Sequence, residues 1–408
     1  MKIHELSNKK ILVVGLGLEG TATVRFLRQF VPSAMVGTTD VKDGPDYLNK
    51  QREYDLAIRS PGVPKELIDI PYTTATNIFF ANTKGQVIGI TGTKGKSTTT
   101  SLIYELLKES GKRVHLCGNI GRPLLNELRQ EDDADEIYVC ELSSYQLTDI
   151  QYSPHISVII NLFPEHMNYH GTVANYFAAK KRIIQFANND DYFVYNQKYP
   201  ELVDLAKRSK IRSLPFIQKL PFPDADIPLL GSHNKDNVRA AVTVAGIYGI
   251  SSDKMRSAVK NFIPLPHRLQ NVGTYNGITF YDDAISTTPE STICAIESFS
   301  QIGTILVGGQ DRGYDFRTLV DVIAGHNIKN VIYFPDSGKK IAQLLERYPN
   351  VTAFPASNMS DAVKLCYQYT PINTVCLLSC ASPSYSLWKN FEEKGNLFQQ
   401  FVKKYAIS

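Results

Sequence analysis

Short apolar runs alternate with longer amphipathic stretches along most of the chain. The runs at 11–15, 34–38 and 55–58 have the length of strands, and residues 21–30 have the spacing of a helix. The same alternation returns further along the chain. Strands and helices that alternate at these lengths predict mostly parallel sheets covered by helices, and therefore an α/β protein.

The alternation falls into three blocks, which predict three α/β domains with boundaries at 1–82, 83–263 and 264–408. In the second block we expect strands and helices at 86–90, 98–109, 113–116, 137–141, 158–162, 176–186 and 237–248. A proline-bearing linker at 262–266 precedes the third block. There we expect a hairpin over 273–281 that turns at Asn276-Gly277, and strands at 304–307, 331–334 and 375–378.

The segment 89–97, Gly-Ile-Thr-Gly-Thr-Lys-Gly-Lys-Ser, lies between an expected strand and an expected helix. In such a loop the glycines let backbone amides face a polyphosphate, at the positive end of the following helix. Lys96 can then reach the terminal phosphates, and the Ser97 hydroxyl can hold Mg²⁺. The common pattern has glycine where this chain has Ile90, so the motif is a variant that predicts nucleotide binding.

A second glycine-rich turn, Gly15–Gly20, follows the first strand, and Asp40 ends the next one. This spacing is typical of a backbone that approaches a pyrophosphate, with a carboxylate for a ribose hydroxyl. The turn is compatible with NAD, with a nucleoside-diphosphate substrate, or with no ligand at all. A nucleoside diphosphate fits better, because the next domain already carries a triphosphate loop.

Three further side chains follow the phosphate loop. Glu141 ends a strand and can face Ser97 across a magnesium ion, since strand ends point into the ligand crevice of such sheets. His166 follows another strand, and Lys180 lies on an amphipathic helix. Without further context, this histidine would be a structural hydrogen-bonding residue and this lysine a solvated one.

Composition and charge narrow the function classes. The chain has 408 residues, of which 43% are hydrophobic, and 44 basic against 40 acidic residues give a net charge of +4. With no basic run, nucleic acid is not an expected partner. The six cysteines lack zinc-site spacing and indicate buried free thiols in a reducing compartment. No segment has the length of a membrane span, so we expect a cytoplasmic protein.

Ordered motifs over nearly the whole chain resemble the Mur ligases. They are the glycine turn and residues 60–63, 92–97, 118–121, 141–146, 165–167, 178–180, 233–237, 266–268, 379–384 and 389–392. The resemblance implies a Rossmann-like N-terminal domain, a central P-loop ATPase-type domain and a Rossmann-like C-terminal domain. It also implies an ATP-dependent amide ligase of peptidoglycan precursor synthesis. This ligase would add glutamate, with D-glutamate favoured, to UDP-N-acetylmuramoyl-L-alanine through an acyl-phosphate, and would act as a monomer.

The resemblance also assigns roles to residues. ATP contacts are implied for Gly92, Thr93, Lys94, Gly95, Lys96, Ser97, Asn119, Asn237, Arg268 and Asp283. Contacts to the UDP substrate are implied for Gly15, Leu16, Gly17, Leu18, Glu19, Gly20, Asp40, Ser60, Pro61, Gly62, Asn119, Ser143 and Gln146. Lys96, Glu141, His166 and Lys180 would be catalytic, with Ser97 and Glu141 at one magnesium ion and His166 and Lys180 at a second. In similar enzymes this lysine carries a CO₂-derived carbamate, which turns an ammonium into a carboxylate-like ligand.

The incoming glutamate would contact Thr287, Arg312, Ser384 and Trp388. Three positions depart from the family pattern. Glu165 and Asn168 stand where aspartate is common, and Ile285 stands where lysine is frequent. The missing cation at Ile285 leaves the identity and handedness of the amino acid open, and the first domain is short.

Four other functions remain open at this point. Two are ligases: a sibling Mur-type enzyme that uses another amino acid, including L-glutamate, and a folylpolyglutamate synthetase-like enzyme. A Rossmann dehydrogenase would bind NAD at the glycine turn but would leave the loop at 92–97 without a purpose. A nucleotide switch would bind ATP without amino-acid-dependent ADP release.

Overall fold

The computed structural model describes residues 1–128 and 134–406. The chain forms two compact units, one of residues 1–227 with 233–262 and the other of residues 228–232 with 263–408. The first unit holds two sheets and the second holds one. The finer boundaries at 82/83 and 263/264 stay predictions.

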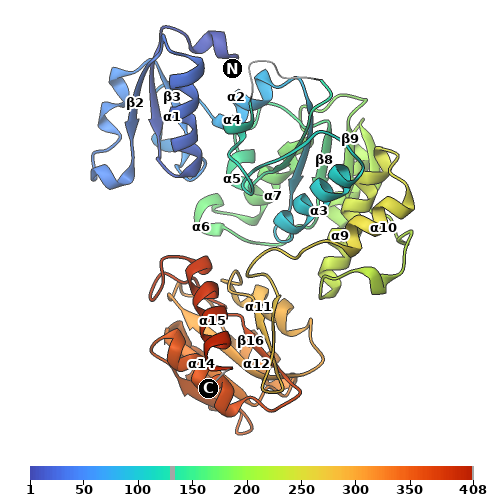
Figure 1. Cartoon of the computed structure of the whole chain (residues 1–408). Coiled ribbons are helices and arrows are strands. Elements are labelled where there is room, and N and C mark those ends of the chain that lie inside the picture. The colour runs from blue at the N-terminus through green and yellow to red at the C-terminus, as the bar shows by residue number, and fades with distance from the viewer. Residues whose placement is uncertain (129–133, 407–408) are drawn as a thin grey trace. The chain divides into compact units, whose positions relative to one another are not determined.

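The first sheet of unit 1 has four parallel strands in the order β2-β1-β3-β4. The strands are β1 (Lys10–Val14), β2 (Met35–Thr39), β3 (Leu56–Arg59) and β4 (Tyr72–Thr73), and the helices are α1 (Leu18–Phe30) and α2 (Ala75–Asn82). The apolar run of β1 is buried from its second residue onward. Helix α1 lies beside this sheet (Figure 1), so its N-terminus opens at the carboxyl end of β1.

The second sheet of unit 1 has six parallel strands in the order β10-β9-β8-β5-β7-β6. These strands are β5 (Gln86–Thr91), β6 (Val114–Gly118), β7 (Ile137–Glu141), β8 (Ile156–Ile159), β9 (Tyr192–Tyr195) and β10 (Arg212–Pro215). The helices are α3 (Lys96–Glu109), α4 (Leu124–Glu127), α5 (Ser144–Leu147), α6 (Met167–His170), α7 (Val173–Lys181), α8 (Pro200–Arg208), α9 (Ser232–Ile247) and α10 (Ser252–Lys260). Since β5 lies between β7 and β8, the segments that follow these three strands meet at one edge of the sheet.

One buried apolar cluster joins the two sheets of unit 1. It includes Ile11 and Val13 of β1, Phe79 of α2 and Tyr138 of β7. The rings of Phe79 and Tyr138 meet edge to face with centroids 5.2 Å apart, an arrangement that aromatic pairs prefer. This shared core fixes the glycine turn relative to the phosphate loop.

Unit 2 contains a six-stranded sheet in the order β11-β12-β16-β13-β14-β15. Its strands are β11 (Gln270–Tyr275), β12 (Ile278–Asp282), β13 (Ile302–Gly309), β14 (Asn330–Asp336), β15 (Thr352–Pro355) and β16 (Val375–Leu378). Its helices are α11 (Pro289–Ile296), α12 (Arg317–Gly325), α13 (Ser337–Leu345), α14 (Met359–Tyr369) and α15 (Phe391–Tyr405). Strands β11 and β12 are antiparallel, and the other pairings in this sheet are parallel.

The predicted α/β class with mostly parallel sheets is confirmed. The predicted hairpin is present, with Asn276 and Gly277 between β11 and β12, both at positive φ. All six cysteines are free thiols, and five are buried. Cys294 is exposed, because it lies on the outer face of α11, so the expectation of a buried thiol is wrong there.

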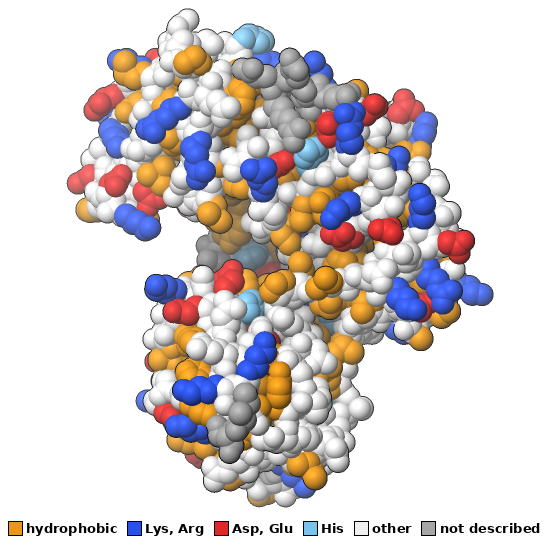
Figure 2. Space-filling model, in the orientation of Figure 1, with side chains coloured by type: hydrophobic (Ala, Val, Ile, Leu, Met, Phe, Trp, Pro, Cys, Tyr) orange, Lys and Arg blue, Asp and Glu red, His pale blue; other side chains and the backbone are white. Residues whose placement is uncertain are grey.

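Two surface properties bear on partners. Within the described residues, no helix is both long and apolar enough to cross a bilayer. On the face shown in Figure 2, basic and acidic side chains are interspersed. The charge on that face is therefore mixed and forms no single-sign field.

Candidate active site

The phosphate loop connects β5 to α3. Gly95 has φ 82° and immediately precedes the first residue of the helix, Lys96. A Cβ at Gly95 would lie 2.4 Å from Oδ1 of Asn237, so both the backbone conformation and the close neighbour require glycine. The Lys96 ammonium donates to the carbonyls of Gly92, at 3.0 Å, and Thr93, at 2.9 Å. Its charge therefore lies at the loop, where polyphosphate is expected.

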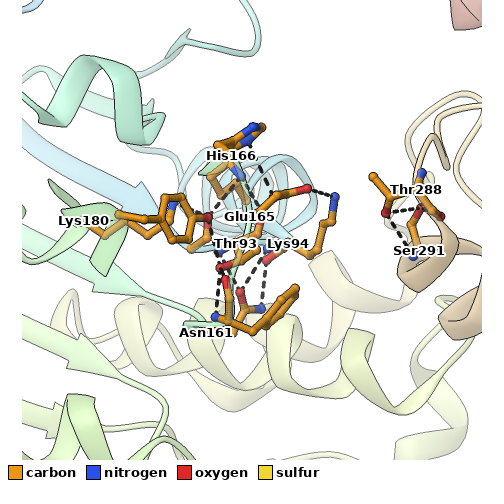
Figure 3. A network of polar contacts seen from close by, with 12 residues as sticks. Thr93, Lys94, Asn161, Glu165, His166, Lys180, Thr288 and Ser291 are labelled. Atoms are coloured by element: carbon orange, nitrogen blue, oxygen red, sulfur yellow. Dashed lines mark hydrogen bonds and ion pairs between the residues drawn. The ribbon is translucent and has the colours of Figure 1, made fainter. Parts of the chain in front are cut away.

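Asn161, which sequence reasoning gave no role, supports this loop. It follows β8, and its Oδ1 accepts from the Thr93 N–H at 2.8 Å and the Lys94 N–H at 3.0 Å (Figure 3). Its Nδ2 donates to the Lys94 carbonyl at 3.0 Å. The Tyr176 hydroxyl donates to Thr93 Oγ1 at 3.1 Å. The signal in the sequence was an amide residue just after a strand, but only the strand order shows that β8 adjoins β5.

Glu141 ends β7 as predicted and is 2% exposed. Its Oε1 accepts from Asn119 Nδ2 at 2.8 Å, whereas Oε2 is buried and finds no hydrogen-bond partner among the described residues. An unpaired buried carboxylate oxygen is costly. A hard cation such as Mg²⁺ binds oxygen ligands of this kind, so the Glu141 carboxylate fits a metal ligand.

Lys180 is buried, with 1% of its surface exposed. Its Nζ donates to the Gly92 carbonyl at 2.7 Å and lies 4.8 Å from the centre of the Tyr176 ring (Figure 3). Burial, followed by the nearby Lys96 ammonium, lowers the pKa of Lys180 well below its usual value. The neutral amine that carbamate formation requires is therefore favoured, which fits the predicted modification.

His166 caps α6 with φ 59°, a conformation uncommon for side chains other than glycine. Burial lowers its pKa, and Lys96 adds to this effect while Glu165 opposes it. Neutral imidazole is the form that binds metal ions. Within residues 1–128 and 134–406, no cluster of three or more His, Cys, Asp and Glu side chains is arranged to hold a metal ion. A second metal site at His166 would therefore depend on other donors.

Glu165, one of the departures from the family pattern, forms an ion pair with Lys94 of the loop. Burial raises the pKa of Glu165, but the hydrogen-bonded Lys94 ammonium, with His166 and Lys96, outweighs burial, and the net pKa lies below the usual value. The longer side chain at this position thus holds a loop lysine. The side chain of Asn168, a second departure, lies outside the described part of the structure.

The glycine turn and Lys96 of the phosphate loop line one cavity of about 630 Å³. A Cβ at Gly20 would lie 1.9 Å from the Gly15 carbonyl oxygen, so the turn requires glycine there. Asp40 Oδ2 accepts from the Leu16 N–H at 2.7 Å, and this bond lowers the pKa of Asp40. The predicted residues that line the cavity are Gly15, Gly17, Leu18, Glu19, Gly20, Asp40, Ser60, Pro61, Gly62, Lys96, Asn119, Ser143, Gln146, His166 and Lys180.

Arg59, which the sequence did not single out, organises the loop at 60–63. It ends β3 and is fully buried. Its guanidinium donates to the carbonyls of Ser60, at 3.3 Å, and Pro61, at 3.2 Å, and it also pairs with Asp149. A buried arginine with carbonyl and carboxylate partners holds the cavity wall in one conformation.

The predicted nucleotide contacts that do not line this cavity are Leu16, Gly92, Thr93, Lys94, Gly95, Ser97, Asn237, Arg268 and Asp283. Asn237 on α9 is buried in unit 1 and accepts from Thr99 Oγ1 at 3.2 Å, beside the phosphate loop. Arg268 and Asp283 belong to unit 2. Asp283 follows β12 and accepts from Ser379 Oγ at 2.8 Å, and burial raises its pKa to about 6.

The predicted amino-acid contacts lie in unit 2. Arg312 is exposed, and its guanidinium carbon lies 5.9 Å from the centre of the Tyr385 ring. The Gln310 N–H donates to the Pro383 carbonyl at 2.8 Å, so the segments that carry Arg312 and Ser384 are adjacent. Ser384 Oγ is buried and has no hydrogen-bond partner in the described residues. It is therefore available to a ligand.

Thr287 and Trp388, the other two predicted glutamate contacts in unit 2, differ in their burial and surroundings. Thr287 is half-buried and follows Ile285 in the loop between β12 and α11. Trp388 is 8% exposed and packs edge to face on Phe334, with ring centroids 4.9 Å apart. Its ring is thus part of the apolar core, although its assigned contact with glutamate remains a prediction.

The comparisons with known proteins agree with one another. The family described as Mur ligase middle domain matches residues 90–222. A Streptococcus agalactiae protein named UDP-N-acetylmuramoylalanine--D-glutamate ligase is 33% identical, over 97% of this chain and 97% of that protein. A Salinispora tropica protein named UDP-N-acetylmuramoyl-L-alanine--L-glutamate ligase is also 33% identical, over 100% of each chain. The solved structure of Thermotoga maritima MurF ligase in complex with ADP superposes with a TM-score of 0.65 at 16% identity, covering 99% of this chain and 97% of that one.

Proposed function

This chain belongs to the Mur ligase family, and from that premise we propose that it joins glutamate to UDP-N-acetylmuramoyl-L-alanine at the expense of ATP. The observation that carries the proposal is the single cavity into which both the glycine turn and Lys96 of the phosphate loop project. A dehydrogenase needs no triphosphate loop beside its dinucleotide turn. A ligase needs the carboxylate of a nucleotide-linked substrate close to the γ-phosphate of ATP.

The reaction has two chemical steps. A carboxylate oxygen of the UDP substrate attacks the γ-phosphorus as the bond to ADP breaks, and an acyl-phosphate forms. The amine of glutamate then attacks the acyl carbon, loses a proton and expels phosphate. Lys96 and the loop amides hold the phosphates of ATP in this arrangement, because phosphoryl transfer depends mainly on positioning and charge neutralisation.

Ser97 and Glu141 are the residues that would hold a magnesium ion beside the loop. The unpaired Glu141 Oε2 supports this assignment, and the ion would neutralise phosphate charge. His166 and a carbamate on Lys180 would supply the second metal site. The burial of Lys180 against the Gly92 carbonyl supports the carbamate.

The UDP group is assigned to the glycine turn, with Asp40 as the carboxylate for the ribose. We predict that Asp40→Ala raises the KM for the UDP substrate about ten- to hundredfold, because a hydrogen bond to a charged group contributes about 1.5–3 kcal/mol. The KM for ATP should change little. Steady-state ADP release with each substrate varied in turn measures both constants.

The matched control is Asp46→Ala, which removes an exposed aspartate of the same region that does not line the cavity. It should leave both KM values near those of the wild type. An equal rise of both constants in Asp40→Ala would contradict the assignment, as would tight binding of NAD by the wild type.

The amino acid is assigned to unit 2, where Arg312 would pair with the side-chain carboxylate of glutamate. Ser384, on the segment adjacent to that of Arg312, has an Oγ without a hydrogen-bond partner in the described residues, which supports a ligand site there. We predict that Arg312→Ala raises the KM for glutamate about a hundredfold, because a lost charge pair costs about 2–5 kcal/mol. Initial rates with varied glutamate and with varied ATP measure the two constants, and only the first should change.

Arg317→Ala is the control, since Arg317 is an exposed arginine of the same unit that pairs with Asp315. It should leave the KM for glutamate unchanged. A similar rise in both variants would point to a general charge effect and would remove Arg312 from the pocket.

Handedness is tested separately. We propose D-glutamate, the substrate named for the Streptococcus agalactiae relative, with L-glutamate as the alternative named for the Salinispora tropica relative. Ile285 places an apolar side chain where the family resemblance implies a lysine. ADP release with the UDP substrate across a panel of D- and L-amino acids decides between them. Preference for an uncharged or cationic amino acid would overturn the glutamate assignment, and ADP release that no amino acid stimulates would overturn the ligase.

The compartment and the oligomeric state follow from the proposed reaction. Both substrates and ATP are water-soluble metabolites, so we propose that the enzyme works in the cytoplasm. We propose that it acts as a monomer, because unit 1 contains both the phosphate loop and the glycine turn.

A further inference from the structure

An acidic side chain, Glu19, lies in the cavity that we assign to an anionic substrate. It is the second residue of α1 and belongs to the glycine turn. An ionised carboxylate at this place would repel a diphosphate. Its presence therefore needs an explanation beyond the backbone geometry of the turn.

The carboxyl of Glu19 is held in a fixed orientation. Gln146 Nε2 donates to Glu19 Oε2 at 2.9 Å. The amide oxygen of Gln146 accepts from the Ser143 N–H at 2.9 Å and from Ser143 Oγ at 3.0 Å. Because these bonds define which end of the amide donates, Glu19 Oε2 is an acceptor in this arrangement. Gln146 and Ser143 thus set the hydrogen-bonding role of Glu19 Oε2.

The other oxygen is left for a ligand. Glu19 Oε1 is shielded from water and has no hydrogen-bond partner within the part of the chain that the structure describes. Whether it is ionised or protonated, it needs a partner to offset its burial. The cavity is where such a partner can come from.

The surroundings favour the protonated form. Burial raises the pKa of Glu19 to about 7, and the Gln146 hydrogen bond and the Arg59 guanidinium oppose this rise. Arg59 is itself paired with Asp149. The other ionisable side chains that line the cavity are those of Asp40, Lys96, Tyr145, His166 and Lys180. A bound diphosphate would add negative charge and would favour the proton further.

We propose that Glu19 binds the UDP substrate as a neutral carboxylic acid, with Oε1 donating to a phosphate oxygen while Oε2 accepts from Gln146. The inference rests on the proposed function and makes Glu19 a proton-coupled binding residue of the same site. The ionised enzyme takes one proton from solvent when it binds the substrate, so charge and atoms balance. Substrate binding is therefore coupled to pH.

The proposal predicts that affinity for the UDP substrate falls as the pH rises. The diphosphate raises the pKa of Glu19 from about 7 in the free enzyme to a higher value in the complex. Affinity is full below the free pKa, where Glu19 is already protonated. Affinity falls, up to tenfold for each pH unit, as the pH rises through the interval between the two values. Above the second value it becomes constant again.

Isothermal titration of the full-length enzyme with UDP-N-acetylmuramoyl-L-alanine, in two buffers of different ionisation enthalpy, measures proton uptake directly. Near pH 8 the wild type should take up close to one proton. Glu19→Gln should take up markedly less, because its amide can donate to phosphate without a proton from solvent. The Kd of Glu19→Gln should stay constant between about pH 7 and pH 8.5, whereas the wild-type Kd rises over this interval. At pH 8.5 the Kd of the variant should therefore be lower than that of the wild type.

Glu66→Gln makes the same exchange at an exposed residue outside the cavity lining and should behave as the wild type. Binding by the wild type without proton uptake would overturn the inference, as would an unchanged pH slope in Glu19→Gln. Wild-type enzyme that does not bind the UDP substrate at any pH would overturn the proposed function itself, and this inference with it.

Discussion

Replacing Lys96 with alanine is expected to lower kcat for ADP release by at least about a hundredfold while leaving the fold intact. The Lys96 ammonium lies on the carbonyls of Gly92 and Thr93, at the loop itself. Loss of one preorganised donor to a developing charge costs about 3–4 kcal/mol, and a full cation should cost no less. Initial rates, ATP affinity and a thermal melt separate loss of chemistry from loss of structure.

Lys108→Ala is the matched control, because Lys108 lies near the other end of α3 with its side chain exposed. It should retain wild-type rates and wild-type melting. If Lys96→Ala kept most of its ADP release, the segment at 92–97 would not be the phosphate site.

The strand, loop and helix around residues 92–97 could be predicted because their signal is local. A strand, a glycine-rich turn and a Lys-Ser pair lie within about a dozen residues, and each feature has one structural meaning. The helix start was less accurate. The pattern predicts a helix from residue 98, whereas α3 begins at Lys96. The left-handed Gly95 ends the loop, so both Lys96 and Ser97 belong to the first turn of the helix.

The partners of the loop could not be predicted, because they depend on strand order. Asn161 supports Thr93 and Lys94 only because β8 pairs with β5. Likewise, Gln146 meets Glu19 across 127 positions of sequence. Each of these residues was visible in the chain, but the sequence contained no local sign of the contact. The exposure of Arg312 and the packing of Trp388 in the core are further properties that spacing does not determine.

Lys180 is the residue for which the local pattern was most misleading. A lysine on an amphipathic helix is normally solvated, yet this side chain is buried beside the Gly92 carbonyl. Long charged side chains usually extend to water. A lysine held away from water next to a phosphate loop indicates a functional role.

We predict that Lys180→Ala is nearly inactive, with kcat lowered at least about a thousandfold, a loss of about 4 kcal/mol in transition-state stabilisation. An unmodified ammonium would repel a metal ion, whereas the buried neutral amine can add CO₂ and release a proton to give a carbamate. Acetate, a small carboxylate, should restore part of the activity to the alanine variant. The neighbouring Lys181→Ala, outside the cavity lining, should keep wild-type rates and show no response to acetate.

The carbamate also has a readout that does not depend on turnover. Wild-type enzyme incubated with isotopically labelled bicarbonate should show a carbamate signal by nuclear magnetic resonance, and Lys180→Ala should lack it. The signal should weaken as the pH falls, because protonation of the amine competes with addition of CO₂. Full activity of Lys180→Ala would refute a catalytic role for this lysine. An inactive Lys180→Ala variant together with a wild type that shows no carbamate signal would instead mean that Lys180 acts as a buried amine. The Gly92 carbonyl would then hold this amine to fix the shape of the loop.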